Sequence, residues 1–373
     1  MTYLAELWLT DFRCYEQAEL RFPPGVTVIC GANAQGKTSL LEAVAWAATG
    51  KSFRGVPDAA LVRNDAATAI LRAEVVDGPR VQLLEAEIRA SGRNRVQLNR
   101  QAVQRTRDLL DLMRVTVFAP DDLQLVKGGP AGRRDYLDDL LVAISPRYEA
   151  ARADYDRVLR QRNALLRGGL RGEDAVVTLD VFDAQLASAG AELTRGRIRL
   201  LERLVPAIAH AYAELAGVAT PVTASYEAEW LPVAEGDGVD PDLAFESVLL
   251  DALGARRRAE TERGVTLVGP HRDEWRLRVG GFDSRTHASQ GEQRTLALAL
   301  RLGGHRLCAE LTGTAPVLLL DDVFSELDEQ RSVALVAHLA SGQTLVTTAG
   351  AVPRGVSADR LLRVDAGRIE QAA

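Results

Sequence analysis

Apolar residues change their spacing along the chain, and the change predicts its organisation. Residues 3–30 and 68–118 carry short apolar stretches typical of strands, and residues 39–48 between them have helical spacing. From about 130 to 260 apolar residues recur three and four positions apart, which predicts helices. Strands are expected again from about residue 265. The pattern therefore predicts an α/β part built from both ends of the chain, with a mainly helical part inserted between them.

The apolar seams of the inserted part are short. The clearest cover residues 148–158, 182–193 and 198–215, and Pro206 is expected to interrupt the third. A twenty-residue helix spans only about 30 Å, so these seams predict a compact helical lobe or stubby arm and no long coiled coil. The glycine-, aspartate- and proline-rich stretch 233–241 is expected to be a loop.

The apolar run Val26–Ile29 is followed by a glycine-containing turn and a helix-like segment, an order typical of a phosphate-binding loop. Gly31 and Gly36 allow backbone angles that a Cβ would penalise, so successive N–H groups can face phosphate oxygens at a helix N-terminus. We expect Lys37 to reach the β- and γ-phosphates of ATP and the Thr38 hydroxyl to hold Mg²⁺. A chance match in a glycine-containing turn is the alternative. The residues expected to bind nucleotide here are Gly31, Ala32, Asn33, Ala34, Gln35, Gly36, Lys37, Thr38 and Ser39.

A second apolar run, Val317–Leu320, ends in two adjacent carboxylates. A continuous apolar run predicts a buried parallel strand, which brings its C-terminal end to the sheet edge where a phosphate loop would lie. Asp321 is the expected second Mg²⁺ ligand, and Asp322 is expected to orient or deprotonate the attacking water. An apolar strand that simply meets solvent at an aspartate is the plainer explanation. The preceding phosphate-loop pattern favours the ATPase interpretation.

Two more segments carry a specific pattern. Ser289 and Gly291 lie just before a long helix-like run, and Ser325 and Asp328 follow the two carboxylates closely. This arrangement resembles the signature motif and D-loop of the ABC ATPase superfamily. Ser289 and Glu292 also have the Ser-x-x-Glu spacing of a helix capping box, and both interpretations can hold because a capped N-terminus still attracts an anion. The resemblance implies that the γ-phosphate on one subunit meets this motif on a second subunit, in a nucleotide-sandwich homodimer.

The switch residue of that superfamily, which follows the next strand, is usually histidine. Here the apolar segment after Gln343 runs into Thr347 and Thr348. We therefore expect a hydroxyl to replace the imidazole as the sensor of the γ-phosphate, and both threonines are candidate catalytic residues.

Composition narrows the class of protein. The chain has 373 residues, 47% of them hydrophobic, and a formal net charge of −6, so charge alone does not predict a nucleic-acid partner. No window approaches the roughly 18 uninterrupted apolar residues of a membrane helix, and the N-terminus lacks a signal-like core. The three cysteines are far apart and form no zinc-binding spacing. We expect a soluble protein of the reducing cytoplasm with no membrane partner.

Arginines gather between residues 89 and 107, a stretch without acidic residues and with apolar alternation suited to a hairpin. A solvated arginine face is the usual explanation of such a run, and contact with DNA phosphates is the alternative. The candidate DNA-binding residues are Arg89, Arg93, Arg95, Arg100, Arg105 and Arg107. The competing surface in the helical lobe is formed by Arg152, Arg160 and Arg167, or by Arg195, Arg199 and Arg203.

Five passages together resemble one branch of the SMC-like ABC ATPases, the RecF family. The longest covers residues 120–138, and the shorter ones are 11–13, 50–54, 269–274 and 324–328. The resemblance implies an ABC-type P-loop ATPase head assembled from the N- and C-terminal segments, with an inserted, mainly helical lobe. The expected limits are 1–125 plus 265–373 for the ATPase domain and 126–264 for the insertion.

The resemblance also implies a function. Members of the RecF family bind gapped DNA or single-strand/double-strand junctions as an ATP-induced dimer and hydrolyse ATP slowly. They act with RecR and RecO to help RecA load at damaged or stalled sites. An SMC-like structural head in a larger DNA-organising complex is the alternative, and an ABC subunit driving transport is a weaker one. The glutamine-loop equivalent stays unassigned, because Pro120 and Asp121 stand where a glutamine is expected.

Overall fold

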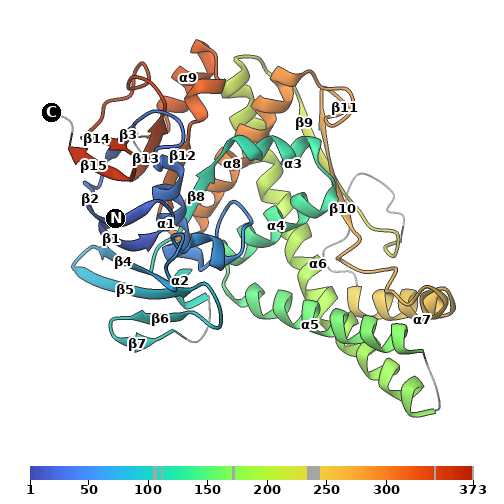
Figure 1. The fold of residues 1–373 in the computed structure, drawn as a ribbon. Coiled ribbons are helices and arrows are strands. Elements are labelled where there is room, and N and C mark those ends of the chain that lie inside the picture. Colours follow the sequence, from blue (N-terminus) through green and yellow to red (C-terminus); the bar gives the residue numbers. More distant parts are fainter. Residues whose placement is uncertain (104–106, 111, 170–172, 233–243, 340–341, 372–373) are drawn as a thin grey trace. The chain divides into compact units, whose positions relative to one another are not determined.

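The computed structural model divides the chain into two compact units (Figure 1). It describes residues 1–103, 107–110, 112–169, 173–232, 244–339 and 342–371. The first unit comprises Met1–Asp122, Ala211–Ala219 and Leu298–Ala373, and the second comprises Leu123–His210 and Thr220–Ala297. Both ends of the chain thus contribute to one unit. The expected domain limits at residues 125 and 265 stay a prediction.

Two sheets of six strands each form the framework of the first unit, as far as the chain is described. One sheet is antiparallel, in the order β2-β1-β4-β5-β6-β7. Its strands are β1 (Thr2–Phe12), β2 (Tyr15–Arg21), β4 (Thr68–Asp77), β5 (Arg80–Arg89), β6 (Arg95–Leu98) and β7 (Gln101–Ala102). The strands expected within residues 3–30 and 68–118 are therefore confirmed, including the hairpin in the arginine-rich stretch.

The second sheet of this unit joins strands from distant parts of the chain, in the order β15-β14-β3-β13-β12-β8. All neighbours are parallel except β14 and β15. In Figure 1 the N-terminal strand β3 lies among the red and orange strands of the C-terminal segment. The strands are β3 (Val26–Cys30), β8 (Val115–Phe118), β12 (Val317–Asp321), β13 (Thr344–Thr348), β14 (Arg360–Asp365) and β15 (Arg368–Gln371).

Helix α1 (Lys37–Thr49) is buried on nearly every side because it packs on strands of both sheets, β4 of the first and β8, β12 and β13 of the second. An all-round apolar sequence such as Leu40–Leu41 and Ala43–Ala48 is what such a position requires. The remaining short helices of the unit are η1 (Asp58–Leu61), α2 (Arg107–Leu110), η2 (Pro120–Asp122), η3 (Val323–Glu326) and α9 (Glu329–Val336).

The second unit is mainly helical and carries one small antiparallel sheet, in the order β11-β10-β9. Its strands are β9 (Val222–Glu227), β10 (Glu274–Val279) and β11 (Phe282–Asp283). Its helices are α3 (Leu123–Lys127), α4 (Pro130–Ile144), α5 (Arg147–Gly168) and α7 (Phe245–Arg263), with the first parts of α6 (Glu173–Ala216) and α8 (Gln290–Thr312). Strand β9 lies within the range expected to be helical, so that expectation was too broad. The loop expected at 233–241 lies outside the described residues.

Helix α6 corrects the prediction of short interrupted helices. It runs for 44 residues through Pro206, about 66 Å at 1.5 Å per residue. A proline inside a helix costs roughly 3 kcal/mol. Here Leu204 and Ile208 on either side of it are fully buried, and packing on both sides favours continuation. The seams at 182–193 and 198–215 therefore belong to one helix.

The segment Gly269–Glu274, one of the family-like passages, is a packing centre of the second unit. The Pro270 carbonyl accepts a 2.7 Å hydrogen bond from buried Arg197 of α6. The His271 Nδ1 lies 2.6 Å from the Tyr155 hydroxyl of α5. Glu274 forms a bidentate ion pair with Arg133 of α4. One short segment thus fixes three helices.

A buried histidine of the first unit makes folding sensitive to acid. His305 of α8 is 6% exposed, its Nδ1 lies 3.0 Å from the Thr116 hydroxyl, and burial lowers its pKa to about 4. The unfolded chain, with a histidine pKa near 6.5, takes up this proton first as the pH falls. The contribution of neutral His305 to the free energy of unfolding is therefore fully present above about pH 6.5. It is lost as the pH falls toward 4, which lowers the free energy of unfolding by up to about 3 kcal/mol.

Urea unfolding of wild type and His305→Asn at pH 7 and pH 5 measures this effect. We expect the stability of the wild type to fall more steeply with acid than that of the variant. His287→Asn, at an exposed position, is the matched control. An identical pH dependence in wild type and His305→Asn would contradict the assignment.

Candidate nucleotide site

Three neighbouring parallel strands bring the phosphate loop, the two aspartates and the two threonines of the predicted ATP site to one sheet edge. Strand β13 lies between β3 and β12, with Thr348 opposite Cys30 and Thr347 opposite Asp321. The phosphate-loop sequence follows β3, and Asp322 follows β12. The structure thus brings together side chains that are nearly 300 positions apart, such as Thr38 and Asp321, whose oxygens are 2.9 Å apart.

The loop after β3 needs its two outer glycines. Gly36 has φ 113° and precedes α1. A Cβ there would lie 2.6 Å from the Cys14 sulfur and 2.8 Å from the Tyr15 hydroxyl, which itself donates to the Gly36 carbonyl. At Gly31 a Cβ would collide with the carbonyl oxygen of Val364. Both positions therefore exclude any side chain, which leaves the loop backbone free to curve around a ligand.

The middle of the loop is held by the turn between β14 and β15. Gln35 accepts hydrogen bonds from the backbone N–H groups of Ala366 at 2.5 Å and Gly367 at 3.2 Å. Ala34 has a left-handed φ of 64°, which costs an alanine about 1–2 kcal/mol. The loop is thus fixed at a conformation that its own sequence does not favour.

Lys37 places its positive charge at this loop. Its side chain is buried, and its ammonium donates to the carbonyl oxygens of Gly31 and Ala32, both at 2.7 Å. The first turn of α1 contains no acidic residue, so no carboxylate competes for the helix N-terminus. The loop therefore combines an ammonium, a helix N-terminus and exposed backbone, the groups that bind polyphosphates.

The oxygens around Asp321 suit a magnesium ion. Thr38 and Thr347 both donate to Asp321 Oδ1, at 2.9 and 2.8 Å, and burial raises the pKa of Asp321. Mg²⁺ prefers such hard oxygen ligands and takes one or two carboxylates together with phosphate oxygens. Among the described residues no cluster of three or more His, Cys, Asp or Glu side chains offers a metal-only cage. The donor set fits a nucleotide-bound magnesium ion.

Asp322 has a carboxylate oxygen without a partner. Its Oδ1 is buried and forms no hydrogen bond within the described structure. The residue has a left-handed φ of 51°, and its N–H donates to the Thr347 hydroxyl at 2.9 Å. A buried carboxylate oxygen left without a donor is costly unless water or a ligand binds it. This atom is therefore available to a water at the phosphate-binding edge.

The two threonines at the end of β13 make different contacts. The Thr347 hydroxyl is fully buried and joins Asp321 to the backbone of Asp322. The Thr348 hydroxyl accepts from Gly350 N–H at 3.2 Å and lies 3.4 Å from the Ala351 carbonyl. Thr347 thus positions the Asp321 carboxylate and the Asp322 backbone, and the sensing of a γ-phosphate by either threonine stays a prediction.

A buried ion pair that sequence reasoning missed fixes α1 to two family-like passages. Glu42 is fully buried and accepts two 2.8 Å hydrogen bonds from Arg13. It also accepts one from the Ser52 hydroxyl. Glu42 is a single charged residue within the apolar sequence of α1, which could have indicated a buried ion pair. Its partners could not be identified because they lie in other segments. Breaking such a pair leaves an uncompensated buried charge.

Asp122 of η2 was also missed. Its Oδ1 accepts from Arg301 of α8 at 3.0 and 2.7 Å, while its other oxygen accepts from the Ala119 N–H. Asp121 beside it is exposed. The carboxylate of Asp122 is therefore occupied by structural contacts, and the glutamine-loop equivalent stays unassigned.

The signature-like segment lies in the second unit, where the capping-box interpretation is confirmed. The Ser289 N–H donates to Glu292 at 2.7 Å, and the Glu292 N–H donates to the Ser289 hydroxyl at 3.3 Å. These bonds lower the pKa of Glu292. The Gly291 carbonyl accepts from the Thr295 hydroxyl. Ser289 stays exposed at the start of α8, and its contact with a nucleotide stays a prediction.

The D-loop residues have local roles in the first unit. The Ser325 hydroxyl donates to the Asp322 carbonyl at 2.7 Å. Asp328 caps α9 by accepting from the Arg331 N–H at 2.9 Å and also pairs with the Arg331 guanidinium. Both residues are exposed, so both remain candidates for contact with a nucleotide.

The arginine-rich hairpin is only partly neutralised. Arg89 pairs with Glu87 at 2.8 Å, and Arg95 lies 3.9 Å from the same carboxylate. Arg93 and Arg100 are exposed and have no ion-pair partner in the described structure. Arg105 lies outside the described residues, and only the backbone of Arg107, at the start of α2, is described.

The competing arginines of the helical lobe differ from one another in their ion pairing. Arg152 pairs with Asp135 and Asp139, and Arg195 lies over the Phe245 ring at 5.4 Å. Arg160 and Arg167 are exposed and form no ion pair among the described residues. Arg199 and Arg203 are exposed but have interaction partners. Arg160 and Arg167 therefore serve as the comparison for the hairpin.

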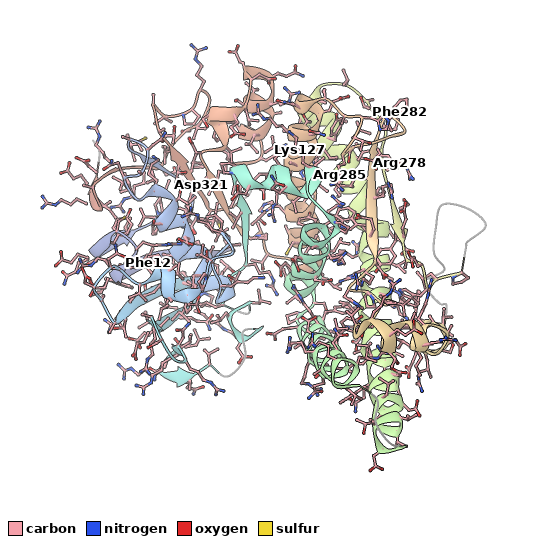
Figure 2. All side chains as sticks on the ribbon, turned by 45° about the vertical axis from the view of Figure 1, so that its right-hand side comes forward. Phe12, Lys127, Arg278, Phe282, Arg285 and Asp321 are labelled. Carbon is pink, nitrogen blue, oxygen red and sulfur yellow. The ribbon has the colours of Figure 1, made fainter. Side chains whose placement is uncertain are left out.

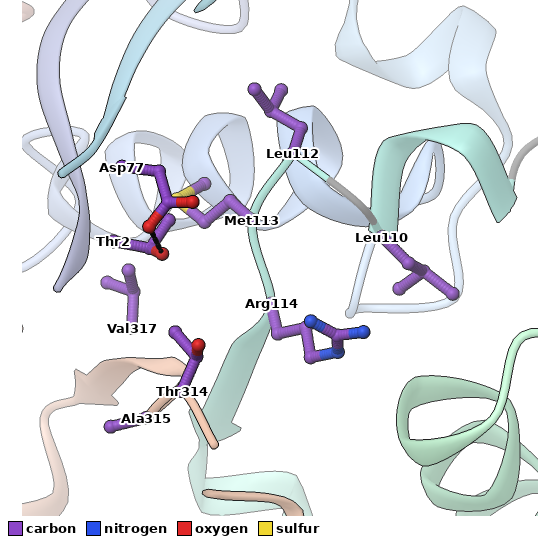
Figure 3. A pocket seen from close by; sticks show the side chains of 9 residues that line it. All are labelled: Thr2, Asp77, Leu110, Leu112, Met113, Arg114, Thr314, Ala315 and Val317. Atoms are coloured by element: carbon purple, nitrogen blue, oxygen red, sulfur yellow. Dashed lines mark hydrogen bonds between the residues drawn. The ribbon is translucent and has the colours of Figure 1, made fainter. Parts of the chain in front are cut away.

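A small pocket lies at the opposite ends of β8 and β12 and is separate from the nucleotide edge (Figure 3). The Thr2 hydroxyl donates to Asp77 at its wall, at 2.6 Å. Its volume is about 80 Å³, well below the roughly 300 Å³ at which pockets for small-molecule ligands begin. It is therefore too small for a nucleotide. Its lining residues are Thr2, Asp77, Leu110, Leu112, Met113, Arg114, Thr314, Ala315 and Val317.

None of the helices in the described ranges combines the length and hydropathy that a bilayer span requires.

Comparison with known proteins gives consistent results. The RecF/RecN/SMC N terminal domain family matches residues 3–365. The DNA replication and repair protein RecF of Frankia alni is 47% identical, with full coverage of both chains. The protein of the same name from Streptomyces avermitilis is 44% identical and covers 99% of this chain and 100% of its own.

Solved structures agree with the sequence matches. The recombination mediator protein RecF-ATP in the RecFOR pathway superposes with a TM-score of 0.91 at 31% identity, covering 100% of this chain and 98% of that one. The corresponding RecF-ATPrS structure gives a TM-score of 0.90. The Smc head domain of Pyrococcus furiosus shares the fold alone, with a TM-score of 0.57 at 17% identity over 100% of this chain and 96% of that one.

Proposed function

The chain belongs to the RecF family of DNA replication and repair proteins, and from that premise we propose that it is an ATP-dependent DNA-binding protein. In this proposal it binds ATP and Mg²⁺, dimerises around the nucleotide, holds gapped DNA or single-strand/double-strand junctions, and hydrolyses ATP slowly. The observation that carries the proposal is the set of contacts around Asp321, which receives hydrogen bonds from Thr38 of the phosphate loop and Thr347 of β13.

In the proposed mechanism the site residues of the first unit have distinct roles. The loop N–H groups and Lys37 neutralise the phosphates and hold them in line. Thr38 and Asp321 would hold Mg²⁺, which supplies further positive charge to the transferred phosphoryl group. The free Oδ1 of Asp322 orients the attacking water and accepts its proton. Thr347 keeps both aspartates in position.

The proposed dimer uses the start of α8 as the second half of each site. A helix N-terminus capped by its own serine still presents N–H groups and a positive dipole end to an anion. The γ-phosphate bound at one phosphate loop would meet Ser289 and Gly291 of the partner subunit. ADP lacks that phosphate, so it should leave monomers. ATP would thus gate dimer formation, and hydrolysis would time release.

The cellular role follows from the family. We propose that the ATP-bound dimer marks gapped DNA at damaged or stalled sites and acts with RecR and RecO so that RecA can load. Each hairpin offers Arg93 and Arg100 without ion-pair partners in the described structure, and two hairpins in a dimer would reach the phosphates of one duplex. The first test is phosphate release with and without gapped DNA, which should rise when DNA is added.

Salt dependence tests the DNA surface. Neutralisation of about four phosphates by the two hairpins predicts a log–log slope of affinity against salt near −3.6. Replacing Arg93, Arg95 and Arg100 by glutamate should weaken binding of gapped DNA strongly, flatten the slope and remove DNA stimulation of ATPase activity, with basal hydrolysis intact.

The matched comparison is the double variant Arg160→Glu and Arg167→Glu in the helical lobe. We expect it to keep the wild-type slope. An unchanged slope in the hairpin variant together with a flatter slope in the lobe variant would place the duplex on the lobe.

A further inference from the structure

The β10–β11 hairpin of the second unit presents an unusual side chain. Phe282 is 65% exposed, and it is the one aromatic residue among the strongly exposed large apolar side chains of the described chain. No other residue between 270 and 290 belongs to that exposed apolar group. Figure 2 labels Phe282 and Arg278 on this hairpin, Arg285 just after it, and Lys127 at the end of α3.

The hairpin holds Phe282 rigidly. Gly280 and Gly281 have φ values of 60° and 85°, as a two-residue turn with both φ values positive requires. Val279 pairs with Phe282 across the turn, and β10 is anchored along its other edge by β9. The Phe282 ring lies against His287, with centroids 5.9 Å apart. An exposed ring on a fixed backbone loses little freedom when a flat ligand stacks on it.

The charges around the hairpin leave a cationic excess. Glu274 is paired with Arg133, and Asp283 accepts from Arg276 at 3.2 Å and from the N–H groups of Arg285 and Thr286. Glu227 is paired with Arg276 at 3.0 Å. These three acids therefore already have an arginine partner, and Arg276 serves two of them.

Two cations remain unpaired and a third is weakly held. Lys127 and Arg285 have no ion pair in the described part of the unit, whereas Arg278 donates to the Ser225 hydroxyl at 3.2 Å and lies 3.9 Å from Glu227. Arg285 and Val126, the neighbour of Lys127, line one hollow of about 90 Å³. Helix α3, which carries Lys127, and the segment after β11, which carries Arg285, therefore border the same hollow. The exposed ring is thus accompanied by positive charge and by no second exposed apolar side chain from residues 270–290.

We propose that this hairpin is a contact site for single-stranded DNA, in which an unpaired base stacks on Phe282 and the adjacent phosphates bind Lys127, Arg285 and Arg278. An aromatic platform beside cations is the combination that binds single strands without reading sequence. Aromatic and arginine side chains are also enriched at protein interfaces, so a protein partner is the competing occupant that the experiment must separate. A duplex keeps its bases stacked and offers none to the ring. The inference rests on the proposed DNA-binding function and adds the position and chemistry of the single-strand contact.

Fluorescence anisotropy with a labelled oligo(dT) and a labelled blunt duplex, both in the presence of a slowly hydrolysed ATP analogue, tests the site on the full chain. Phe282→Ala should weaken oligo(dT) binding about 5- to 150-fold, because each stacked base contributes roughly that factor, and should leave duplex binding unchanged. Phe282→Trp should retain binding. Lys127→Glu with Arg285→Glu should flatten the salt slope for oligo(dT) by about 0.7 per lost phosphate contact.

Val333→Ala removes a comparably exposed apolar side chain, at 61%, and Arg258→Glu reverses a highly exposed arginine, so both serve as controls. Wild-type oligo(dT) affinity in Phe282→Ala overturns the inference, as does an equal loss for the duplex. A Phe282→Ala protein that loses ATP-dependent dimerisation but binds oligo(dT) normally assigns the hairpin to a protein contact and also overturns it. If the wild type binds neither DNA, the proposed function fails together with the inference.

Discussion

Lys37→Ala is expected to remove ATP turnover, with a loss of at least about 10²-fold. The Lys37 ammonium is buried at the phosphate loop and is held there by the carbonyls of Gly31 and Ala32. In the proposed mechanism it faces the place where negative charge accumulates on the transferred phosphoryl group, so its removal would leave that charge without a partner. Phosphate release under steady-state conditions, with nucleotide affinity measured separately, gives the result.

Substitutions of the two adjacent aspartates are expected to separate ATP binding from the chemical step of hydrolysis. Asp321→Ala should also remove turnover, because Thr38 and Thr347 lose their shared acceptor. Asp322→Asn should leave ATP bound and slow only the chemical step, because an amide cannot accept the proton of the attacking water. Arg21→Ala, at an exposed arginine on β2, is the control for nonspecific effects. Wild-type turnover by a pure Asp322→Asn preparation would show that Asp322 has another role.

Ser289→Arg is expected to keep ATP binding but to abolish ATP-dependent dimers. A shift from about 1% to 99% dimer requires roughly 5.5 kcal/mol of differential binding, which the two bridging γ-phosphates would supply. The larger cationic side chain would occupy the place of the phosphate and keep the subunits apart. Sedimentation velocity with ATP and with ADP measures the change directly.

The control for Ser289→Arg must carry the same substitution elsewhere. Ser247 is an exposed serine near the N-terminus of α7 in the same unit, and Ser247→Arg should dimerise like the wild type. Loss of the Ser289 cap costs about 1 kcal/mol, so thermal unfolding of both variants shows whether the fold persists. A Ser289→Arg protein that sediments as an ATP-dependent dimer would contradict the proposed interface.

The sequence predicted those parts of the site that depend on consecutive residues. The loop after β3 and the carboxylates after β12 follow from apolar runs, glycines and aspartates at short spacing, and parallel strands bring their ends to one edge. The cap at Ser289 was likewise readable from the spacing to Glu292. Each of these features depends on local chemistry.

Features that depend on partners far along the chain could not be predicted. Glu42 finds Arg13, and Asp122 finds Arg301, only after the units have folded. The sequence predicted an interruption at Pro206, because proline disfavours the interior of a helix. The burial of Leu204 and Ile208, which favours a continuous α6, cannot be seen in the sequence. The pairing of Thr347 with Asp321 likewise required the strand order.

The central claim, that each ATP is hydrolysed between the phosphate loop of one subunit and the Ser289 segment of another, is tested most directly by mixing two inactive variants. Lys37→Ala retains a working Ser289 segment, and Ser289→Arg retains a working phosphate loop. A mixed dimer therefore contains one complete site, and we predict that the mixture hydrolyses ATP at a fraction of the wild-type rate although neither variant does so alone. A mixture that sediments as a mixed dimer with ATP yet stays inactive, or full activity of Ser289→Arg by itself, would contradict the shared site.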